Sequence, residues 1–233
     1  KQSEGQMDTL LIRLIGPHQA WGVQSVGENR DTGFEPSKSG VIGLLCAALG
    51  RPREYPLDDL NSLRMGVRID QAGHLERDFQ TIHKLTESGE EIQNGTSIST
   101  RYYLSGAAFL VGLEGKLETL EMLQEALIHP HWLLYLGRKA FPPSVPIFLP
   151  DGLRRYESLE DALKNYPFLL PQFPAEKSSQ RKLPDKLWLV IEDTNGAEVY
   201  RDEPVSFAER HFRTRRIRRT RIENPGQNPI KEI

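Results

Sequence analysis

Apolar residues in this chain occur in short runs separated by polar segments, and the spacing within each run predicts its structure. Compact apolar runs predict strands at 9–15, 65–69, 102–104 with 107–113, and 187–191. Residues 117–128 have apolar side chains at helical spacing, which predicts an amphipathic helix. A capping-box pattern at 158–161 predicts a short helix over 159–166.

The most apolar run follows the segment SKSG at 37–40 and predicts a helix over 39–49. A serine before an apolar run is an N-cap signal, and Gly50 with a proline two residues later is a stop signal. Almost every residue of this helix is apolar or small, so we expect it to be buried against a sheet.

Residues 74–100, in contrast, are polar and contain turn signals at 88–89 and 94–95. A polar stretch of this length is either disordered or a projecting hairpin. Further on, Asn195-Gly196 between two strand-like runs predicts a two-residue β-hairpin, and 205–222 predicts a basic strand.

This order of strands and helices predicts an α+β fold of the ferredoxin-like type, with helices on one face of the sheet. We expect residues 7–150 to form this domain, 151–222 to form a small C-terminal β region and 223–233 to form a tail. Residues 1–6 are polar, and we expect them to be a linker or cloning remnant outside the fold.

Composition and cysteine usage exclude several classes of protein. No apolar run approaches the ~20 residues that span a bilayer, and no signal-peptide pattern is present, so no membrane partner is expected. The single cysteine, Cys46, allows no internal disulfide and favours a reducing, cytoplasmic compartment. One cysteine and six scattered histidines give no zinc spacing, so we predict no metal and no cofactor.

The formal net charge of −2 conceals an uneven distribution of charge. Segment 210–222 (RHFRTRRIRRTRI) holds seven arginines and no acid, whereas the rest of the chain has 23 basic against 32 acidic residues, a net charge of −9. Arginines this close repel one another unless anions lie nearby, and phosphate matches their geometry. Three interpretations stay open. The segment contacts nucleic acid; or it has no external partner, being either a solvated tail or a contact with the chain's own acidic surface; or it contacts a polyanionic protein.

Enzymatic motifs are weak in this sequence. Segment 33–39 superficially resembles a P-loop, but it is one residue short and lacks the second glycine, which argues against nucleotide hydrolysis. The helix N-terminus after it can still bind a phosphate through free N–H groups and Lys38, with an ordinary cap as the alternative. A second function considered is a metal-independent endoribonuclease, with His83 or His131 and Tyr102 or Tyr103 as acid and base.

Several motifs, spread over about 7–222, resemble those of one known family. They are LIGPHQAWG at 14–22, Arg30-x-Thr32, PSKSGVIGLL at 36–45, YLGRK at 135–139 followed by Pro142, and RDEP at 201–204 leading to Arg210-x-Phe212. On these residues the chain resembles the Cas five (Cas5) family of CRISPR-associated proteins, in the type I-E form that belongs to the surveillance complex called Cascade.

The resemblance implies a repeat-associated, RNA-recognition-motif-like form of the ferredoxin-like fold, with a projecting β-hairpin thumb that we place at about 77–103. It implies a non-catalytic subunit of a ribonucleoprotein complex in antiviral defence, which holds the 5′ handle of the CRISPR RNA and caps the backbone filament. The implied partners are this RNA, the adjacent backbone subunit CasC and the large subunit CasA. Target DNA is a further candidate partner for the arginine-rich segment.

Residue chemistry and the resemblance together predict an RNA-binding set and no catalytic residue. Segment 37–40 would meet a handle phosphate, and the glycine of 137–139 would let the backbone approach the RNA closely. Residues 101–103 would pair a phosphate and stack a base, whereas Trp21 is either a packing anchor or a stacking platform. The predicted set is Gln19, Trp21, Arg30, Thr32, Ser37, Lys38, Ser39, Gly40, Arg101, Tyr102, Tyr103, Gly137, Arg138, Lys139, Arg213 and Arg215.

Overall fold

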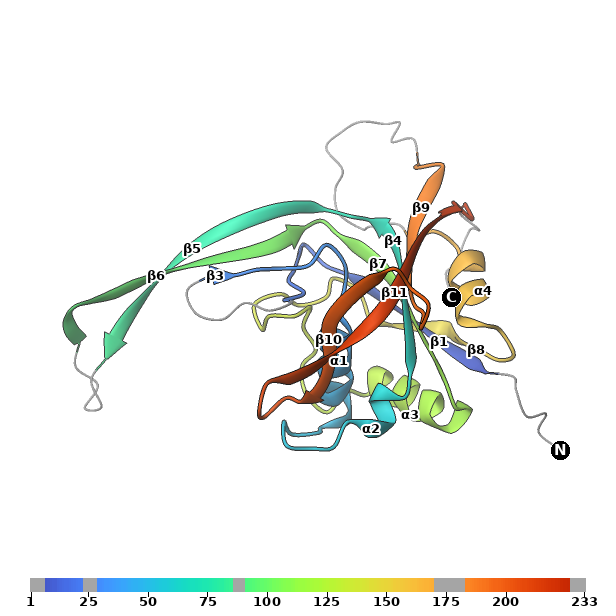
Figure 1. Ribbon diagram of the computed structural model, residues 1–233, viewed down its shortest axis with the longest axis horizontal. Coiled ribbons are helices and arrows are strands. Elements are labelled where there is room, and N and C mark those ends of the chain that lie inside the picture. The colour runs from blue at the N-terminus through green and yellow to red at the C-terminus, as the bar shows by residue number, and fades with distance from the viewer. Residues whose placement is uncertain (1–6, 23–28, 86–90, 170–182, 227–233) are drawn as a thin grey trace.

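The computed structural model describes residues 7–22, 29–85, 91–169 and 183–226, which form a mixed α+β fold (Figure 1). Its centre is a seven-stranded sheet in which every neighbouring pair is antiparallel. From one edge to the other its strands are β10 (Glu198–Ser206), β11 (His211–Glu223), β9 (Lys186–Glu192), β4 (Arg64–Gln71), β7 (Ala108–Gly115), β1 (Asp8–Ile15) and β8 (Phe148–Arg154).

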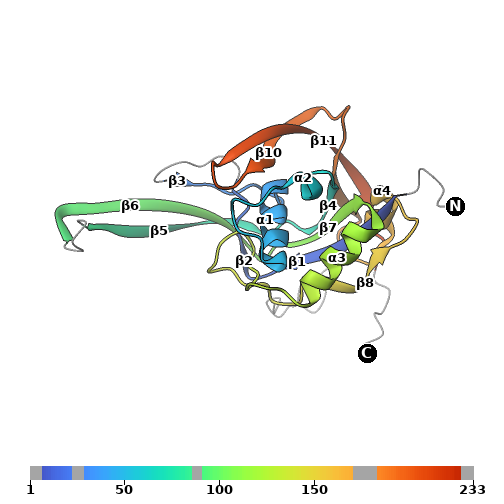
Figure 2. The same ribbon diagram turned by 90° about the horizontal axis from the view of Figure 1, so that it is seen from below.

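The runs predicted as strands at 9–15, 65–69, 107–113 and 187–191 are confirmed as β1, β4, β7 and β9, which lie in the middle of the sheet. Residues 102–104, predicted to join 107–113 in one strand, belong instead to a separate strand of a second sheet, β6 (Glu91–Ser105). Strands buried on both faces read as continuous apolar runs, and the sheet separates two apolar clusters. Helices α1 (Lys38–Leu49) and α3 (Leu117–Ile128) contribute to one cluster, and α4 (Leu159–Asn165) contributes to the other (Figure 2). The short helix α2 (Asp58–Asn61) lies between α1 and β4 in the chain.

Helix α1 confirms the predicted buried helix and both of its end signals. It begins at Lys38, one residue earlier than predicted, because Ser37 is the N-cap and its hydroxyl accepts a hydrogen bond from the Gly40 N–H. It ends at Gly50, whose φ of 70° is the left-handed conformation that glycine adopts at helix C-termini. The short helix predicted after 158 is also present as α4, and Ser158 is its N-cap: its hydroxyl accepts from the Asp161 N–H and donates to the Asp161 carboxylate.

The hairpin predicted at Asn195-Gly196 is wrong. Strands β9 and β10 flank this turn in the chain but do not pair with each other, because β11 lies between them and pairs with both. The chain therefore crosses over β11 at this turn, and a Cβ on Gly196 would lie 2.2 Å from the Ile217 carbonyl oxygen. Here the glycine allows close passage of two backbones rather than a two-residue hairpin.

The C-terminal strands β9, β10 and β11 continue the central sheet. The domain boundary that we expected at residue 150 runs through β8, which spans Phe148–Arg154 and pairs with β1. The 151–222 region therefore shares its hydrogen-bonded ladder and its apolar core with the preceding part of the chain.

The polar stretch at 74–100 belongs to a long antiparallel hairpin that projects from the body (Figures 1 and 2). Its strands are β5 (His74–Leu85) and β6 (Glu91–Ser105). Two short strands, β2 (His18–Gln19) and β3 (Asn29–Arg30), pair with the base of β6 and fix the hairpin to the body. Among the described residues, no helix is both long and apolar enough to cross a membrane.

Candidate nucleic-acid interface

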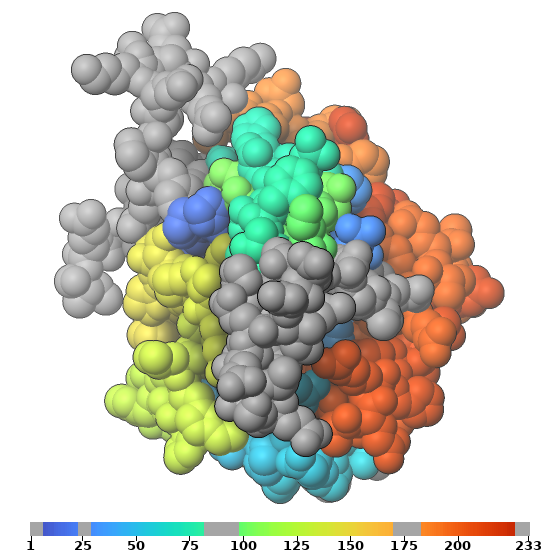
Figure 3. Space-filling model, turned by 90° about the vertical axis from the view of Figure 1, so that its left-hand side faces the viewer, coloured from blue at the N-terminus to red at the C-terminus, as the bar shows by residue number. Residues whose placement is uncertain are grey.

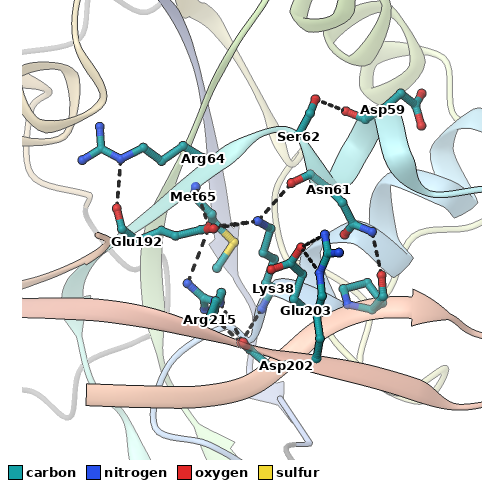
Figure 4. A network of polar contacts seen from close by, with 12 residues as sticks. Lys38, Asp59, Asn61, Ser62, Arg64, Met65, Glu192, Asp202, Glu203 and Arg215 are labelled. Atoms are coloured by element: carbon teal, nitrogen blue, oxygen red, sulfur yellow. Dashed lines mark hydrogen bonds and ion pairs between the residues drawn. The ribbon is translucent and has the colours of Figure 1, made fainter. Parts of the chain in front are cut away.

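The N-terminus of α1, predicted to meet a phosphate, is already occupied by this chain's own carboxylates (Figure 4). Lys38 is 1% exposed, and its Nζ lies 2.9 Å from Oε2 of Glu192. The Lys38 backbone N–H donates to Oδ2 of Asp202 at 2.8 Å. The predicted phosphate contact of Lys38 is therefore wrong, and the ordinary cap provided by buried Ser37 is the interpretation that the geometry supports.

Four arginines of the arginine-rich strand β11 are likewise neutralised from within. Buried Arg215 makes a bidentate contact with Asp202, so its prediction as an RNA contact is also wrong. Three more arginines of this strand reach carboxylates of other segments: Arg213 binds Glu203, Arg218 binds Asp193 and Glu160, and Arg219 binds Glu35 and Glu198. Of the three interpretations of this segment, contact with the chain's own acidic surface is the one that the structure supports.

Trp21 is a packing anchor. Its side chain is fully buried, and its Nε1–H donates to Gln19, whose amide donates to the carbonyls of Leu14 and Ala107. The Trp21 backbone N–H donates to the Thr32 hydroxyl, and a Cβ on Gly40 would lie 2.7 Å from the indole ring. The base-stacking alternative for Trp21 is therefore wrong, and these residues shape the scaffold instead.

Three of the predicted arginines, Arg30, Arg101 and Arg138, do come together, and we call them the arginine cluster. They line one hollow at the base of the hairpin. Parallel pairing of β3 with β6 places Arg30 opposite Arg101. Nη2 of Arg138 donates to the Tyr102 carbonyl at 2.8 Å and the Arg30 carbonyl at 3.3 Å. Segments more than 100 residues apart in the sequence therefore contribute to one basic surface.

The arginine cluster concentrates positive charge. Among the described residues, none of its three arginines forms a salt bridge with a carboxylate. Burial lowers the pKa of Arg138, and the neighbouring charges of Arg101 and Arg30 lower it further, while Asp78 and Asp31 oppose this effect. A site where like charges are held together is stabilised by a bound anion, and arginine favours phosphate. The arrangement can therefore bind a phosphate backbone.

Aromatic rings lie beside the arginine cluster in an adjoining hollow, which Arg101, Arg138 and Lys139 also line. The ring of Tyr103 contacts the His18 ring edge-on at 4.9 Å, and Phe141 lies within 6 Å of both rings. Half-buried aromatic rings next to arginines can stack an unpaired base. Phe141 is absent from the predicted set, although its place two residues after the YLGRK motif was a signal that could have included it.

Two other predicted residues lie apart from this surface. Alternation along β6 directs Tyr102 to the face of the hairpin opposite to Arg101 and Tyr103. Ser39 lines a different hollow, between α1 and Phe207, and its hydroxyl lies 3.4 Å from that of Ser37. Neither side chain is among those that line the two hollows at the base of the hairpin.

Gly137 joins the 135–139 motif to the 14–22 motif. Its φ is 87°, and a Cβ there would lie 1.7 Å from the Ala20 carbonyl oxygen. The Ala20 N–H also donates to the Leu136 carbonyl, so the two segments pack backbone to backbone. This contact holds Arg138 against the base of β6.

We expect Gly137→Ala to destabilise the protein more than Gly226→Ala does. Both glycines have positive φ, which costs an alanine roughly 1–2 kcal/mol, but a Cβ on Gly226 would meet nothing within 4 Å. The backbone clash at Gly137 adds about 1–3 kcal/mol of strain. Urea unfolding of both variants measures the difference, and equal losses of unfolding free energy would show that the Ala20 contact is not tight.

The family of this chain is shown by comparison with known proteins. The family described as CRISPR-associated protein (Cas_Cas5) matches residues 9–218, and the chain belongs to this family. Among curated proteins it is similar to the CRISPR system Cascade subunit CasD of Escherichia coli (strain K12), with 33% identity over 176 residues, 67% of this chain and 76% of the relative.

Two solved structures are also similar to this chain. One, described as "Crystal structure of Cas protein", has 42% identity and a TM-score of 0.76, and the match covers 95% of this chain and 100% of that one. The other, from a "CRISPR RNA-guided surveillance complex", has 32% identity and a TM-score of 0.74, with 96% and 95% covered. The mixed α+β architecture is therefore that of its family.

Proposed function

We propose that this protein is a non-catalytic subunit of a CRISPR RNA-guided surveillance complex that holds the 5′ handle of the guide RNA at the arginine cluster. The observation that carries the proposal is that Arg30, Arg101 and Arg138 line one hollow, next to a second hollow that contains half-buried aromatic rings. The similarity to a Cascade subunit and to a chain of a surveillance complex supports it. In such complexes base pairing reads the target, while protein binds mostly the RNA backbone.

We further propose that strands β8, β1, β7 and β4 with helices α1 and α3 form the ferredoxin-like unit. Two interleaved βαβ units produce this strand order. The β5–β6 hairpin is then the thumb, and its projection suits a contact with the adjacent CasC subunit at the end of the backbone filament. The large subunit CasA is the other proposed protein neighbour. We assign no target-DNA contact to β11, because its arginines are largely paired within the chain.

The endoribonuclease alternative has little support in the geometry. His131 packs over Gly50 at the end of α1 and does not line the hollow that contains Tyr103. His18 does line that hollow, but its ring packs against the rings of Tyr103 and Phe141. The side chain of His83 lies outside the described residues. Incubation of the protein with precursor RNA in EDTA should give no discrete products, and sharp products would refute the non-catalytic assignment.

Photo-crosslinking of the assembled complex tests the RNA-binding site. Guide RNA with 4-thiouridine in its 5′ handle should crosslink to peptides that contain Tyr103 or Phe141, because these rings lie beside the arginine cluster. Arg138→Ala should reduce this crosslink at least about tenfold, whereas Arg155→Ala, an exposed arginine paired with Glu121, should not. Handle crosslinks confined to other subunits would contradict the proposal and favour a purely structural adaptor.

A further inference from the structure

An apolar hollow of about 600 Å³ lies between the segment that precedes α1 and the C-terminal strands β9 and β10. In Figure 3 this segment (blue) and the C-terminal strands (orange) lie next to each other, to the right of the hairpin. The proposed RNA-binding function does not use this hollow. Its lining includes Phe34, Ile69, Ala72, Trp188, Val199 and Tyr200.

Large apolar side chains of this hollow are exposed to solvent. Phe34 is 66% exposed, Val199 is 54% exposed and Trp188 is 39% exposed, and all three lie around the same opening. Single exposed apolar residues are ordinary, but a contiguous group rimmed by polar residues marks an interaction surface. The hollow is therefore shaped to receive an apolar side chain.

The polar groups in the wall of the hollow are already satisfied. Buried Glu35 accepts hydrogen bonds from the Tyr200 hydroxyl at 2.8 Å and from Nη2 of Arg219 at 2.6 Å. Burial lowers the pKa of Arg219, but the hydrogen bond to Glu35 and the charges of Glu35, Tyr200 and Glu198 together outweigh burial and raise it. The carboxylate of Glu35 is thus already paired inside the wall, and Ile69 and Val199 offer aliphatic surface rather than base-edge partners. These features favour a protein side chain over a nucleotide.

Two arginines, one in the lining of the hollow and one over its Trp188 ring, differ from the carboxylate-paired arginines of β11. Arg201 lines the hollow, and the hydrogen bond found for it is from Nε to the Phe212 carbonyl at 3.3 Å. Arg221 lies over the Trp188 ring, 4.5 Å from its centroid. Neither forms a salt bridge with a carboxylate in the part of the chain that the structure describes. Two such cations beside an apolar opening match an apolar side chain flanked by carboxylates.

We propose that this hollow is the docking site for a protein segment of a neighbouring subunit, in which a large apolar side chain is flanked by acidic residues. The apolar side chain would enter between Phe34, Val199 and Trp188, and the carboxylates would pair with Arg201 and Arg221. Aromatic residues and arginines of this kind often dominate the binding energy of an interface. The inference requires only that the chain is part of an assembly, and it does not depend on the arginine cluster binding RNA.

Site-specific photo-crosslinking identifies the occupant of the hollow in the assembled complex. A benzophenone side chain is introduced in place of Phe34, which is exposed and can be replaced without loss of core packing. We expect a crosslink to one protein segment that carries acidic residues within about four positions of the attachment point, a spacing that brings side chains to one helix face. Crosslinks to RNA, to a segment without acidic residues, or to nothing would each overturn the proposal.

Reversing the charge of both arginines together tests their part in the docking site. Arg201→Glu combined with Arg221→Glu should reduce the occupancy of the crosslinked subunit at least tenfold in native mass spectrometry, and lysines in place of the partner's acids should restore it. The matched control, Lys116→Glu with Arg155→Glu, reverses two exposed charges elsewhere and should leave occupancy unchanged. RNA content should stay constant in both variants, because the arginine cluster is intact. Unchanged occupancy in the Arg201 and Arg221 variant would overturn the proposal.

Discussion

Asp202→Ala is expected to lower the free energy of unfolding by about 3–5 kcal/mol, the usual cost of removing one member of a buried ion pair. Asp202 is buried, and its carboxylate accepts from Nε and Nη2 of Arg215 at 2.7 and 2.9 Å and from the Lys38 N–H at 2.8 Å (Figure 4). Without it, two buried cations, Lys38 and Arg215, would share the single carboxylate of Glu192, from which Arg215 is 3.8 Å away. The variant therefore leaves a buried charge without adequate compensation.

Urea unfolding measures this loss, and a surface pair provides the control. Asp59→Ala breaks the Arg51–Asp59 contact, in which the aspartate is much more exposed, and should cost at most about 1 kcal/mol. The double variant Asp202→Leu with Arg215→Met removes both partners of the buried pair, so it should regain much of the lost stability. If Asp202→Ala costs no more than Asp59→Ala, the network does not hold α1 to the C-terminal strands.

Local patterns were enough to predict most of the secondary structure. Helix α1 was predicted from a serine cap, an apolar run and a terminal glycine, all of which lie within 14 residues of one another. The four middle strands of the central sheet were predicted because burial on both faces requires continuous apolar runs, whereas β8 at the edge has no such run and was not predicted. The Asn195-Gly196 turn shows the limit of this reasoning: the turn forms, but its two flanking strands pair with a third strand from further along the chain.

The residues of the proposed RNA-binding surface were predicted one by one but not as an arrangement. Lys38 and Asp202 are 164 positions apart, so a motif that predicts a phosphate site gave no indication that a distant carboxylate fills it. The density of arginine in β11 drew attention to the wrong segment, because the acids that neutralise it are dispersed along the chain. Arg30, Arg101 and Arg138 were each in the predicted set, but only the β3–β6 pairing and the Gly137 contact bring them together.

Replacing Arg30, Arg101 and Arg138 together by alanine is expected to weaken binding of the guide-RNA handle at least about a hundredfold. Each arginine can make a charge-assisted contact with phosphate, which contributes roughly 1.5–3 kcal/mol. Each lost phosphate contact also removes about 0.7 from the slope of log affinity against log salt for a single strand, so the slope should fall by about 2. Fluorescence anisotropy with a labelled handle RNA at several salt concentrations measures both quantities.

The decisive comparison is with arginines of β11 that carry the same charge but lie outside the arginine cluster. Arg213 pairs with Glu203, and Arg218 pairs with Asp193 and Glu160. Arg216 donates a hydrogen bond to the Gly196 carbonyl. Replacing these three by alanine removes the same formal charge, but long-range attraction is screened within about 10 Å at 0.1 M salt. We therefore expect less than a threefold loss of affinity and an unchanged slope. Equal effects of the two triple variants would mean that the RNA responds to net charge, and the arginine cluster would lose its status as the handle site.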